Sequence, residues 1–323
     1  MNIFITPHPP IILSEIGMGE EKRAQATIDG MKKIAEDIAA IKPETIAVIT
    51  PHGPAFRDAL CISTQENLKG DFGQFSKPGL SYEFAGSEKA VQLCSLLNDG
   101  GINAVALDRN NAKKYGISGK IDHGALVPLS FILKEYTDFK LIYISMGFLS
   151  KEQLGKAGAI LSGILEEDDA LIVSGDLSHR LSDEAHYGYN PQGAVYDKRI
   201  VDSIANKKYL DILEISDALL NSAGQCAQRP LEMMVGVLDG YETQTQVYSY
   251  EGPYGVGYMT AHIIRQEKGG HSVFAEFSKR QIIKMDNLRK KEDAYVSLAR
   301  KTIETYITTG NIIKVTENLS EEM

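Results

Sequence analysis

Ile3-Phe-Ile-Thr-Pro-His-Pro-Pro10 has a close counterpart later in the chain, Ile46-Ala-Val-Ile-Thr-Pro-His-Gly-Pro54. In each stretch a short apolar run, rich in β-branched residues, is followed by Thr-Pro-His. Because proline cannot donate to a sheet ladder, the pattern predicts two buried strands that end at the proline. Open α/β sheets keep their sites at the carboxyl ends of such strands. We therefore expect the two strands side by side, with His8 and His52 at the same edge.

Predicted strands and helices alternate through residues 1–265, which indicates one α/β domain built around a mainly parallel central sheet, with helices on both faces. Residues 56–85 lack a clear period and are interpreted as a hairpin or an irregular excursion. The predicted helices cover residues 20–41, 87–97, 126–133, 151–165 and 227–238, with further helical pattern over 190–219. The predicted strands cover residues 46–50, 104–107, 140–145 and 170–174, and residues 243–250 and 256–264 form a terminal hairpin.

The composition changes after residue 265. Residues 266–323 are mostly polar and include a heavily charged stretch at 279–293. Two thin apolar stripes run through this region, but it is too short to bury a sizeable core of its own. We expect a charged helical C-terminal tail, separate from the domain over residues 1–265.

The overall composition restricts the function. Lys and Arg number 34 and Asp and Glu 43, which gives a net charge of −9, and no basic run interrupts this balance. The charge argues against nucleic acid or an anionic membrane surface as a partner. The apolar stretches are strand-sized and shorter than a membrane span. Three cysteines are typical of a reducing compartment, so we expect a cytoplasmic protein. The oligomeric state stays open, and a homo-oligomer is one alternative.

Four of the seven histidines follow a predicted strand or begin a predicted helix, and they are His8, His52, His123 and His179. Because such positions open on one edge of a parallel sheet, we expect a shared site. His8 and His52 have no acidic neighbour in the sequence and are expected to be neutral metal ligands.

Two of these histidines do have an acidic neighbour. His123 follows Asp122, and His179 lies three residues after Asp176. A carboxylate beside an imidazole can orient the ring and hold its proton, which suits a general acid or base. Asp176 is equally well explained as a helix cap or a turn residue. His186 lies in the same loop region as His179 and is a candidate for the border of the pocket.

A site with two histidines also needs an anionic ligand. Glu232 is a charge inside the apolar run 230–236, and together with two histidines it would complete the facial triad of non-haem iron oxygenases. Cys226 lies at the predicted start of a helix, where free amide groups would stabilise a thiolate. The periodicity does not choose between Glu232 and Cys226.

The four histidine motifs together resemble those of class III extradiol ring-cleavage dioxygenases of the LigB type, and also those of the Memo proteins, which are similar in fold. The motifs are Thr6-Pro-His-Pro-Pro10, Thr50-Pro-His-Gly-Pro54, Asp122-His-Gly124 and Ser174-Gly-Asp-Leu-Ser-His179, and the resemblance covers about residues 1–265. It implies that His8 and His52 bind ferrous iron. It also implies that His179 is the acid/base catalyst and that His123 contacts substrate or oxygen. The implied reaction opens a catechol ring with O2, next to the hydroxylated carbons.

The resemblance departs from the dioxygenase pattern at the third ligand. The family glutamate falls near Arg229 and Pro230, which cannot replace it. Cys226 matches the Memo pattern, in which a cysteine completes the metal site and an aspartate like Asp176 lies nearby. The resemblance favours Cys226 as the third ligand, with Glu232 as the rival. In the tail, residues 293–306 resemble the first helix of the AMME-syndrome candidate-region domain, with a plain charged helix as the alternative.

Three hypotheses follow. The first is a non-haem iron(II) extradiol-type dioxygenase that uses a small aromatic substrate and O2. The second is a Memo-like metal-binding protein with a redox or accessory role, without ring cleavage, working beside an AMME-region domain or a radical enzyme. The third is a zinc hydrolase that uses the same pocket, since two histidines and a thiolate also suit zinc or another divalent metal.

Overall fold

A computed structural model describes residues 1–313 except 184 and 186. The strands are β1 (Asn2–Thr6), β2 (Thr45–Thr50), β3 (Leu60–Ser63), β4 (Asn67–Phe72), β5 (Lys77–Gly86), β6 (Ala104–Leu107), β7 (Lys140–Ser145), β8 (Ala170–Ser174), β9 (Tyr241–Glu251) and β10 (Tyr258–Lys268). The α-helices are α1 (Ser14–Gly17), α2 (Gln25–Ile41), α3 (Lys89–Asp99), α4 (Arg109–Tyr115), α5 (His123–Ile132), α6 (Lys151–Ser162), α7 (Pro191–Ala205), α8 (Tyr209–Leu213), α9 (Asp217–Ala223), α10 (Gln228–Leu238), α11 (Val273–Arg289) and α12 (Ala294–Thr309). Short 3-10 helices are η1 (Pro10–Ile12), η2 (Glu20–Ala24) and η3 (Gly73–Phe75).

Within the described residues the strands form one ten-stranded mixed sheet, whose main path runs β4-β5-β7-β2-β8-β1-β10-β9. The central strands β7, β2, β8 and β1 are parallel, and β10 and β9 extend them as an antiparallel hairpin. β3 and β6 pair with each other beside β7. The predicted fold, a single α/β domain around a mainly parallel sheet, is confirmed. The region predicted as a hairpin or an excursion supplies β3, β4 and β5.

β1 and β2 are not side by side, contrary to the expectation from the sequence. β8 lies between them, with Thr6 paired to Ser174 on one side and Ile49 to Val173 on the other. The connection from β1 to β2 therefore skips one place in the sheet, and β8, which comes later in the chain, occupies that place. All residues of β8 are buried, as expected for a strand with a neighbour on each edge and helices on both faces. His8 and His52 thus flank the end of β8.

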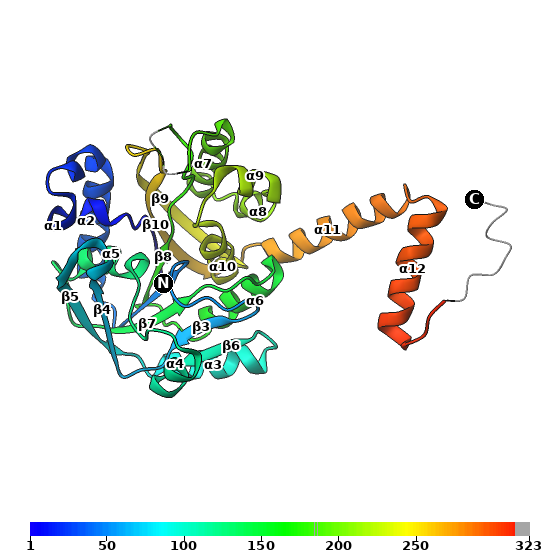
Figure 1. Ribbon diagram of the computed structural model, residues 1–323, viewed down its shortest axis with the longest axis horizontal. Helices are drawn as coiled ribbons and strands as arrows, with labels where there is room; N and C mark the ends of the chain where they lie inside the picture. The colour runs from blue at the N-terminus through cyan, green and yellow to red at the C-terminus, as the bar shows by residue number, and fades with distance from the viewer. Residues whose placement is uncertain (184, 186, 314–323) are drawn as a thin grey trace. The chain divides into compact units, whose positions relative to one another are not determined.

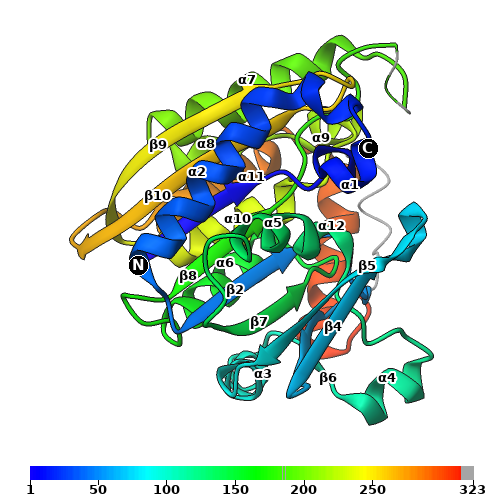
Figure 2. The ribbon, with the colours of Figure 1, turned by 90° about the vertical axis from the view of Figure 1, so that its left-hand side faces the viewer.

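Helices cover both faces of the central sheet, as predicted. α2 and α5 pack together on one face, and α6 and α10 pack together on the other (Figures 1 and 2). α2 buries Met31, Ile34 and Ile38 at spacings of three and four residues, the period of a one-sided helix. α5 begins at His123, earlier than the predicted start at residue 126, because the Asp122 side chain caps it.

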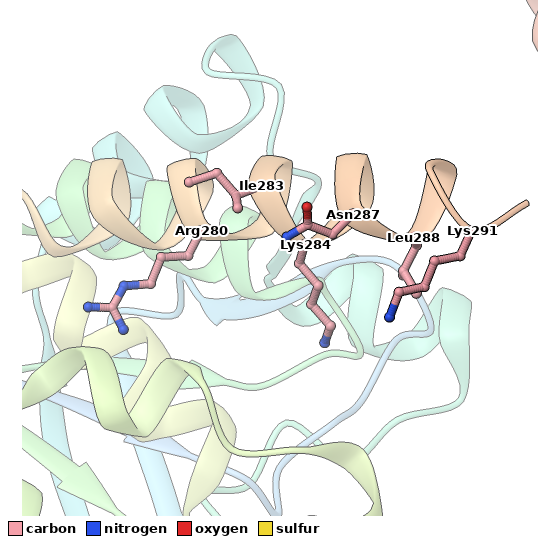
Figure 3. A pocket seen from close by; sticks show the side chains of 6 residues that line it. All are labelled: Arg280, Ile283, Lys284, Asn287, Leu288 and Lys291. Carbon is pink, nitrogen blue, oxygen red and sulfur yellow. The ribbon is translucent and has the colours of Figure 1, made fainter.

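The chain divides into two compact units, Met1–Phe274 and Ala275–Met323. The second unit lies within the region predicted as a charged helical tail. It contains most of α11 and all of α12. Its larger apolar side chains, among them Ile282, Ile303 and Tyr306, are mostly exposed. Side chains of α11, together with Lys291 just after its end, line a pocket, and Figure 3 shows them: Arg280, Ile283, Lys284, Asn287, Leu288 and Lys291. In the part of the chain that is described, no helix combines the length and apolarity needed to cross a bilayer.

Candidate metal centre

One pocket at the carboxyl edge of the parallel strands collects all four predicted histidines. Its volume is about 470 Å³, within the usual range of small-molecule sites. The lining residues are His8, Pro9, Pro10, His52, Phe75, His123, Asp176, His179, Tyr187 and Val256. The four histidines at strand ends or a helix start therefore lie around one pocket.

His8 is buried and held by the end of β8. Its Nδ1 lies 2.8 Å from the Ser174 hydroxyl oxygen, and that hydroxyl donates to the backbone oxygen of Gly124. Because the serine proton is used on Gly124, the serine oxygen accepts from Nδ1–H of His8. The neutral ring then keeps its lone pair on Nε2, the tautomer of a metal-binding imidazole with a supporting hydrogen bond. Burial lowers the pKa of His8 well below 6.5, which favours this neutral form.

Three imidazoles converge above this point. The ring centroid of His8 lies 4.7 Å from that of His52 and 5.5 Å from that of His123. The rings of His52 and His123 are stacked at 4.8 Å. One nitrogen from each of the three rings lies within 4.8 Å of the others, so the group can hold a metal ion. His123, assigned a catalytic contact from the sequence, is thus close enough to be a ligand.

Two groups that can lose a proton adjoin His8. Cys226 Sγ lies 3.6 Å from His8 Nε2, and Asp176 Oδ2 lies 3.9 Å from the same nitrogen. The Asp176 backbone N–H donates to Cys226 Sγ at 3.2 Å. Around a tetrahedral ion with Zn–N and Zn–S bonds of ordinary length, a nitrogen and a sulfur ligand are roughly 3.6 Å apart. His8 and Cys226 therefore already have the spacing of two ligands of one ion.

The predicted stabilisation of a Cys226 thiolate by a helix start is wrong. α10 begins at Gln228, two residues later than Cys226. Burial raises the pKa of the Cys226 thiol well above 9.0, and the Asp176 carboxylate raises it further. In the protein without a bound cation the thiol is protonated at neutral pH, so a metal ion must displace that proton in order to bind sulfur.

His179 lines the pocket and has a ring nitrogen without a partner in the described part of the chain. Its Nε2 is buried and, among the described residues, has no hydrogen-bond partner. The ring is stacked on that of Tyr187, with centroids 5.8 Å apart. Burial, followed by the neighbouring His52, lowers the pKa of His179 to about 4. The ring is therefore neutral at pH 7, and its Nε2 is unpartnered among the described residues.

The two acidic neighbours of the sequence motifs do not orient the histidines that follow them. Asp122 accepts from the Gly124 backbone N–H and the Thr50 hydroxyl, and its other oxygen accepts from the Tyr143 hydroxyl at 2.5 Å. Asp122 is thus a helix cap that joins α5 to β2 and β7. Asp176 accepts from the backbone N–H of His8 at 2.8 Å, and its carboxyl group has a pKa raised to about 7 by burial.

Glu232 is buried away from the pocket lining. Its Oε1 accepts from Gln228 Nε2 at 2.8 Å and lies 3.8 Å from the Lys151 ammonium group. These contacts link α10 to α6. They account for the Glu232 charge within the apolar run 230–236, and no metal ion is needed to explain it. The structure therefore places Cys226 and Asp176, but not Glu232, beside the histidines.

The sequence interpretation assigned no role to several residues that build the site. Ser174 orients His8, although it lies in a quoted motif directly before Gly175 and Asp176. Phe75 and Val256 line the pocket from η3 and from the loop between β9 and β10, segments without a catalytic signature. His186, the candidate for the pocket border, lies outside the described residues.

Comparisons with known proteins identify the family of the chain. Residues 2–261 match the family described as the catalytic LigB subunit of aromatic ring-opening dioxygenase. A protein of Clostridium acetobutylicum is 33% identical over 325 residues, which cover 99% of this chain and 69% of that protein. The 3,4-dihydroxyphenylacetate 2,3-dioxygenase of Escherichia coli is 27% identical over 214 residues, which cover 62% of this chain and 74% of that enzyme.

The fold has also been seen in a crystal structure. An uncharacterised protein of Escherichia coli K12 superposes with a TM-score of 0.57 at 16% identity, covering 82% of this chain and 99% of that one. The family match includes β1, β2, β8 and α5, the elements that carry or precede the four pocket histidines. The chain belongs to the family of the catalytic LigB subunit of aromatic ring-opening dioxygenases.

Proposed function

We propose that the protein is a non-haem iron(II)-dependent, extradiol-type dioxygenase that opens a catechol-like aromatic ring with O2. The observation that carries this proposal is the convergence of His8, His52 and His123 on one pocket, with Nε2 of His8 freed by the Ser174 hydrogen bond. The named activity of the Escherichia coli relative, on 3,4-dihydroxyphenylacetate, supports an aromatic diol as the substrate class.

We assign His8 and His52 as metal ligands and favour Cys226 as the third ligand. The 3.6 Å separation of Cys226 Sγ from His8 Nε2 supports this choice. Asp176 is the rival, because its carboxylate would complete a site of two histidines and one carboxylate. His123 is kept for substrate contact. With the Gln74 amide donating to its Nδ1 at 3.2 Å, the neutral ring carries its proton on Nε2 and acts there as a donor.

A ferrous ion at this position would supply a binding site for the two catechol hydroxyls and reactivity toward O2. The chain's own residues bind the ring and handle its protons. His179 Nε2 is the proton acceptor, because it is neutral, unpartnered and part of the pocket wall. Pro9, Pro10 and Val256 keep water from one side of the ring.

The test is anaerobic loading of the apoprotein with iron(II), followed by oxygen uptake with a panel of catechols that includes 3,4-dihydroxyphenylacetate. We expect oxygen consumption and a ring-opened product in equal amounts with at least one catechol. Full iron occupancy without ring-opened product from any of them would overturn the proposal.

A second candidate is a Memo-like metal-binding protein with a redox or accessory role and no ring cleavage. The specific observation in its favour is the thiol of Cys226 beside His8, in reach of a backbone N–H that stabilises bound sulfur. Its partner would be an AMME-region domain or a radical enzyme, which gives the helical tail a role. The family match ends at Ala261 and does not include that tail.

Two substitutions separate the possible third ligands. Cys226→Ser should abolish a thiolate-to-metal charge-transfer band in the cobalt-loaded protein, whereas Asp176→Asn should leave the band in place. Loss of metal only in Asp176→Asn would instead assign the carboxylate. Element analysis of protein purified without air decides between iron and zinc, because three nitrogen and sulfur donors suit either metal.

A further inference from the structure

The residues that line the pocket are of two kinds. Four imidazoles and the Asp176 carboxyl group supply its polar groups. Five further residues supply mainly apolar surface and form what we call the wall: Pro9, Pro10, Phe75, Tyr187 and Val256. If a catechol presents its hydroxyls to the polar groups, its ring substituents contact this wall.

Hydrogen bonds join the loop that contains Val256 to the segment that contains His179. The loop that carries Val256 pairs with the segment before His179: Leu177 N donates to Gly257 O at 2.8 Å, and Gly257 N donates to Ser178 O at 2.8 Å. Leu181 N also donates to Gly255 O at 2.9 Å. The loop therefore lies beside the His179 segment as a short strand would, and the position of Val256 is set relative to His179.

The loop between β9 and β10 packs closely against Asp197 of α7. A Cβ atom at Gly257 would lie 2.0 Å from Asp197 Oδ2, so the backbone there packs directly on the buried Asp197 carboxyl group. Phe75 contacts the polar part of the lining, with its ring edge-on to that of His123 at a centroid distance of 5.3 Å.

Two nearby basic side chains are not part of the pocket lining. Arg180 packs beside Gly224, the residue that ends α9, and its buried Nε has no hydrogen-bond partner among the described residues. Arg229 lies over the ring of Phe148 at 4.2 Å. Arg23 donates to the backbone oxygen of Pro253 at 2.8 Å. Among the described residues that line the pocket, none is a lysine or an arginine. A substrate carboxylate at the wall would thus lose water without gaining a cationic partner.

We propose that the site selects catechols whose ring substituents are uncharged and apolar over catechols that carry a carboxylate. This inference rests on the proposed dioxygenase function and names its substrate class. An ionised group moved from water to apolar surface without a partner is strongly disfavoured, whereas an alkyl or ester group gains from the same contact. The selectivity therefore comes from the unfavourable contact of a carboxylate with the wall as much as from the favourable contact of an alkyl or ester group.

The experiment compares each acid with a neutral relative of similar shape, using the full iron-loaded chain. The pairs are 3,4-dihydroxyphenylacetate with its methyl ester, and 3,4-dihydroxybenzoate with its methyl ester. We expect kcat/KM for each ester to exceed that of its acid at least tenfold. An acid that is turned over as well as its ester, or better, would overturn the inference while leaving the dioxygenase function intact.

Binding is measured in parallel, by anaerobic titration of the metal-loaded protein with each compound and the change in its absorption spectrum. If no compound is turned over, the proposed function fails, and the ratio of dissociation constants still tests the selectivity. Equal affinity for acid and ester, or no binding of either, would count against the inference.

A charge introduced into the wall provides an independent check. Val256→Arg should move the acid-to-ester ratio of kcat/KM at least tenfold toward the acid. Val256→Met, which enlarges the side chain without charge, is the matched control and should leave that ratio unchanged. An equal shift in both variants would show that size, not charge, determines the preference. Metal content measured for each variant confirms an intact site.

Discussion

The Nδ1 atom of His8 lies 2.8 Å from the hydroxyl oxygen of Ser174, at the end of the strand that separates β1 from β2. The serine hydroxyl donates its own proton to Gly124, so one hydrogen-bond chain links β1, β8 and α5. This chain sets the tautomer of His8 and directs Nε2 toward the other imidazoles. Each element contributes one group, and removal of any one would release the ring.

Ser174→Ala should weaken metal binding about 10- to 100-fold, the usual effect of losing the hydrogen bond that orients a ligating histidine. Competition against a chelator of known affinity measures the change. Ser145→Ala is the matched control, because the Ser145 hydroxyl is buried at the end of β7 without a partner among the described residues. Equal metal affinity in the two variants would contradict the role of Ser174.

Glu232→Gln should leave metal affinity unchanged, within about twofold. The glutamate contacts Gln228 and Lys151, and glutamine keeps the oxygen that accepts from Gln228. Isothermal titration of the variant with iron(II) or cobalt(II), beside Cys226→Ser, is the measurement. A loss of binding as large as that of Cys226→Ser would restore Glu232 as a ligand.

His179→Gln should lower kcat by about 10²- to 10⁴-fold, the range for a lost general acid or base, while metal affinity stays unchanged. The reason is that His179 lines the pocket and its Nε2 has no partner among the described residues, whereas the three rings that could hold a metal ion are those of other histidines. His262→Gln is the control, since that ring is engaged with Asn2 at 2.9 Å on another part of the sheet. Parallel losses of iron and activity would make His179 a ligand instead.

Asp197→Asn should change how stability depends on pH. Burial raises the pKa of Asp197 from 3.8 to about 6, so ionisation opposes folding. The contribution of protonated Asp197 to the free energy of unfolding is fully present below about pH 3.8. It is lost as the pH rises toward about 6. At 1.36 kcal/mol per pKa unit, the loss is at most about 3 kcal/mol.

Urea unfolding of wild type and Asp197→Asn at pH 4.5 and 7.5 measures this effect. The variant should gain stability relative to wild type as pH rises, provided that asparagine keeps the hydrogen bond from Ser178 N. Asp202→Asn, at an exposed position of the same helix, should show no such trend. A constant difference between Asp197→Asn and wild type at both pH values would be the contrary result.

Much of the fold follows from local pattern. The strands at residues 104–107, 140–145 and 170–174 were predicted with the bounds that they have, because each is a short apolar run between turn residues. The region 56–85 was not resolved from its pattern, because its strands β4 and β5 are partly exposed and contain glycine. β5 also pairs with β7, which is distant in the chain, so the place of this hairpin in the sheet is not recorded in its own residues.

The site was only partly predictable. The position of His8, His52, His123 and His179 after strands or at a helix start was enough to place them at one edge of the sheet. The roles of Asp176 and Glu232 were not predictable, because helical periodicity gives the direction of a side chain but not the neighbour that it meets. Asp176 was expected beside His179 and is bonded to the backbone of His8.

The α/β class, the histidines at strand ends and the charged tail could be predicted from the amino-acid order, because they depend on residue type and short spacing. The insertion of β8 between β1 and β2 could not, and it is the folded sheet that places Ser174 beside Nδ1 of His8 and Cys226 beside Nε2. Such contacts join residues more than 160 positions apart, as for His8 with Ser174. Strand order and helix packing over the whole domain select them, and no local pattern records that choice.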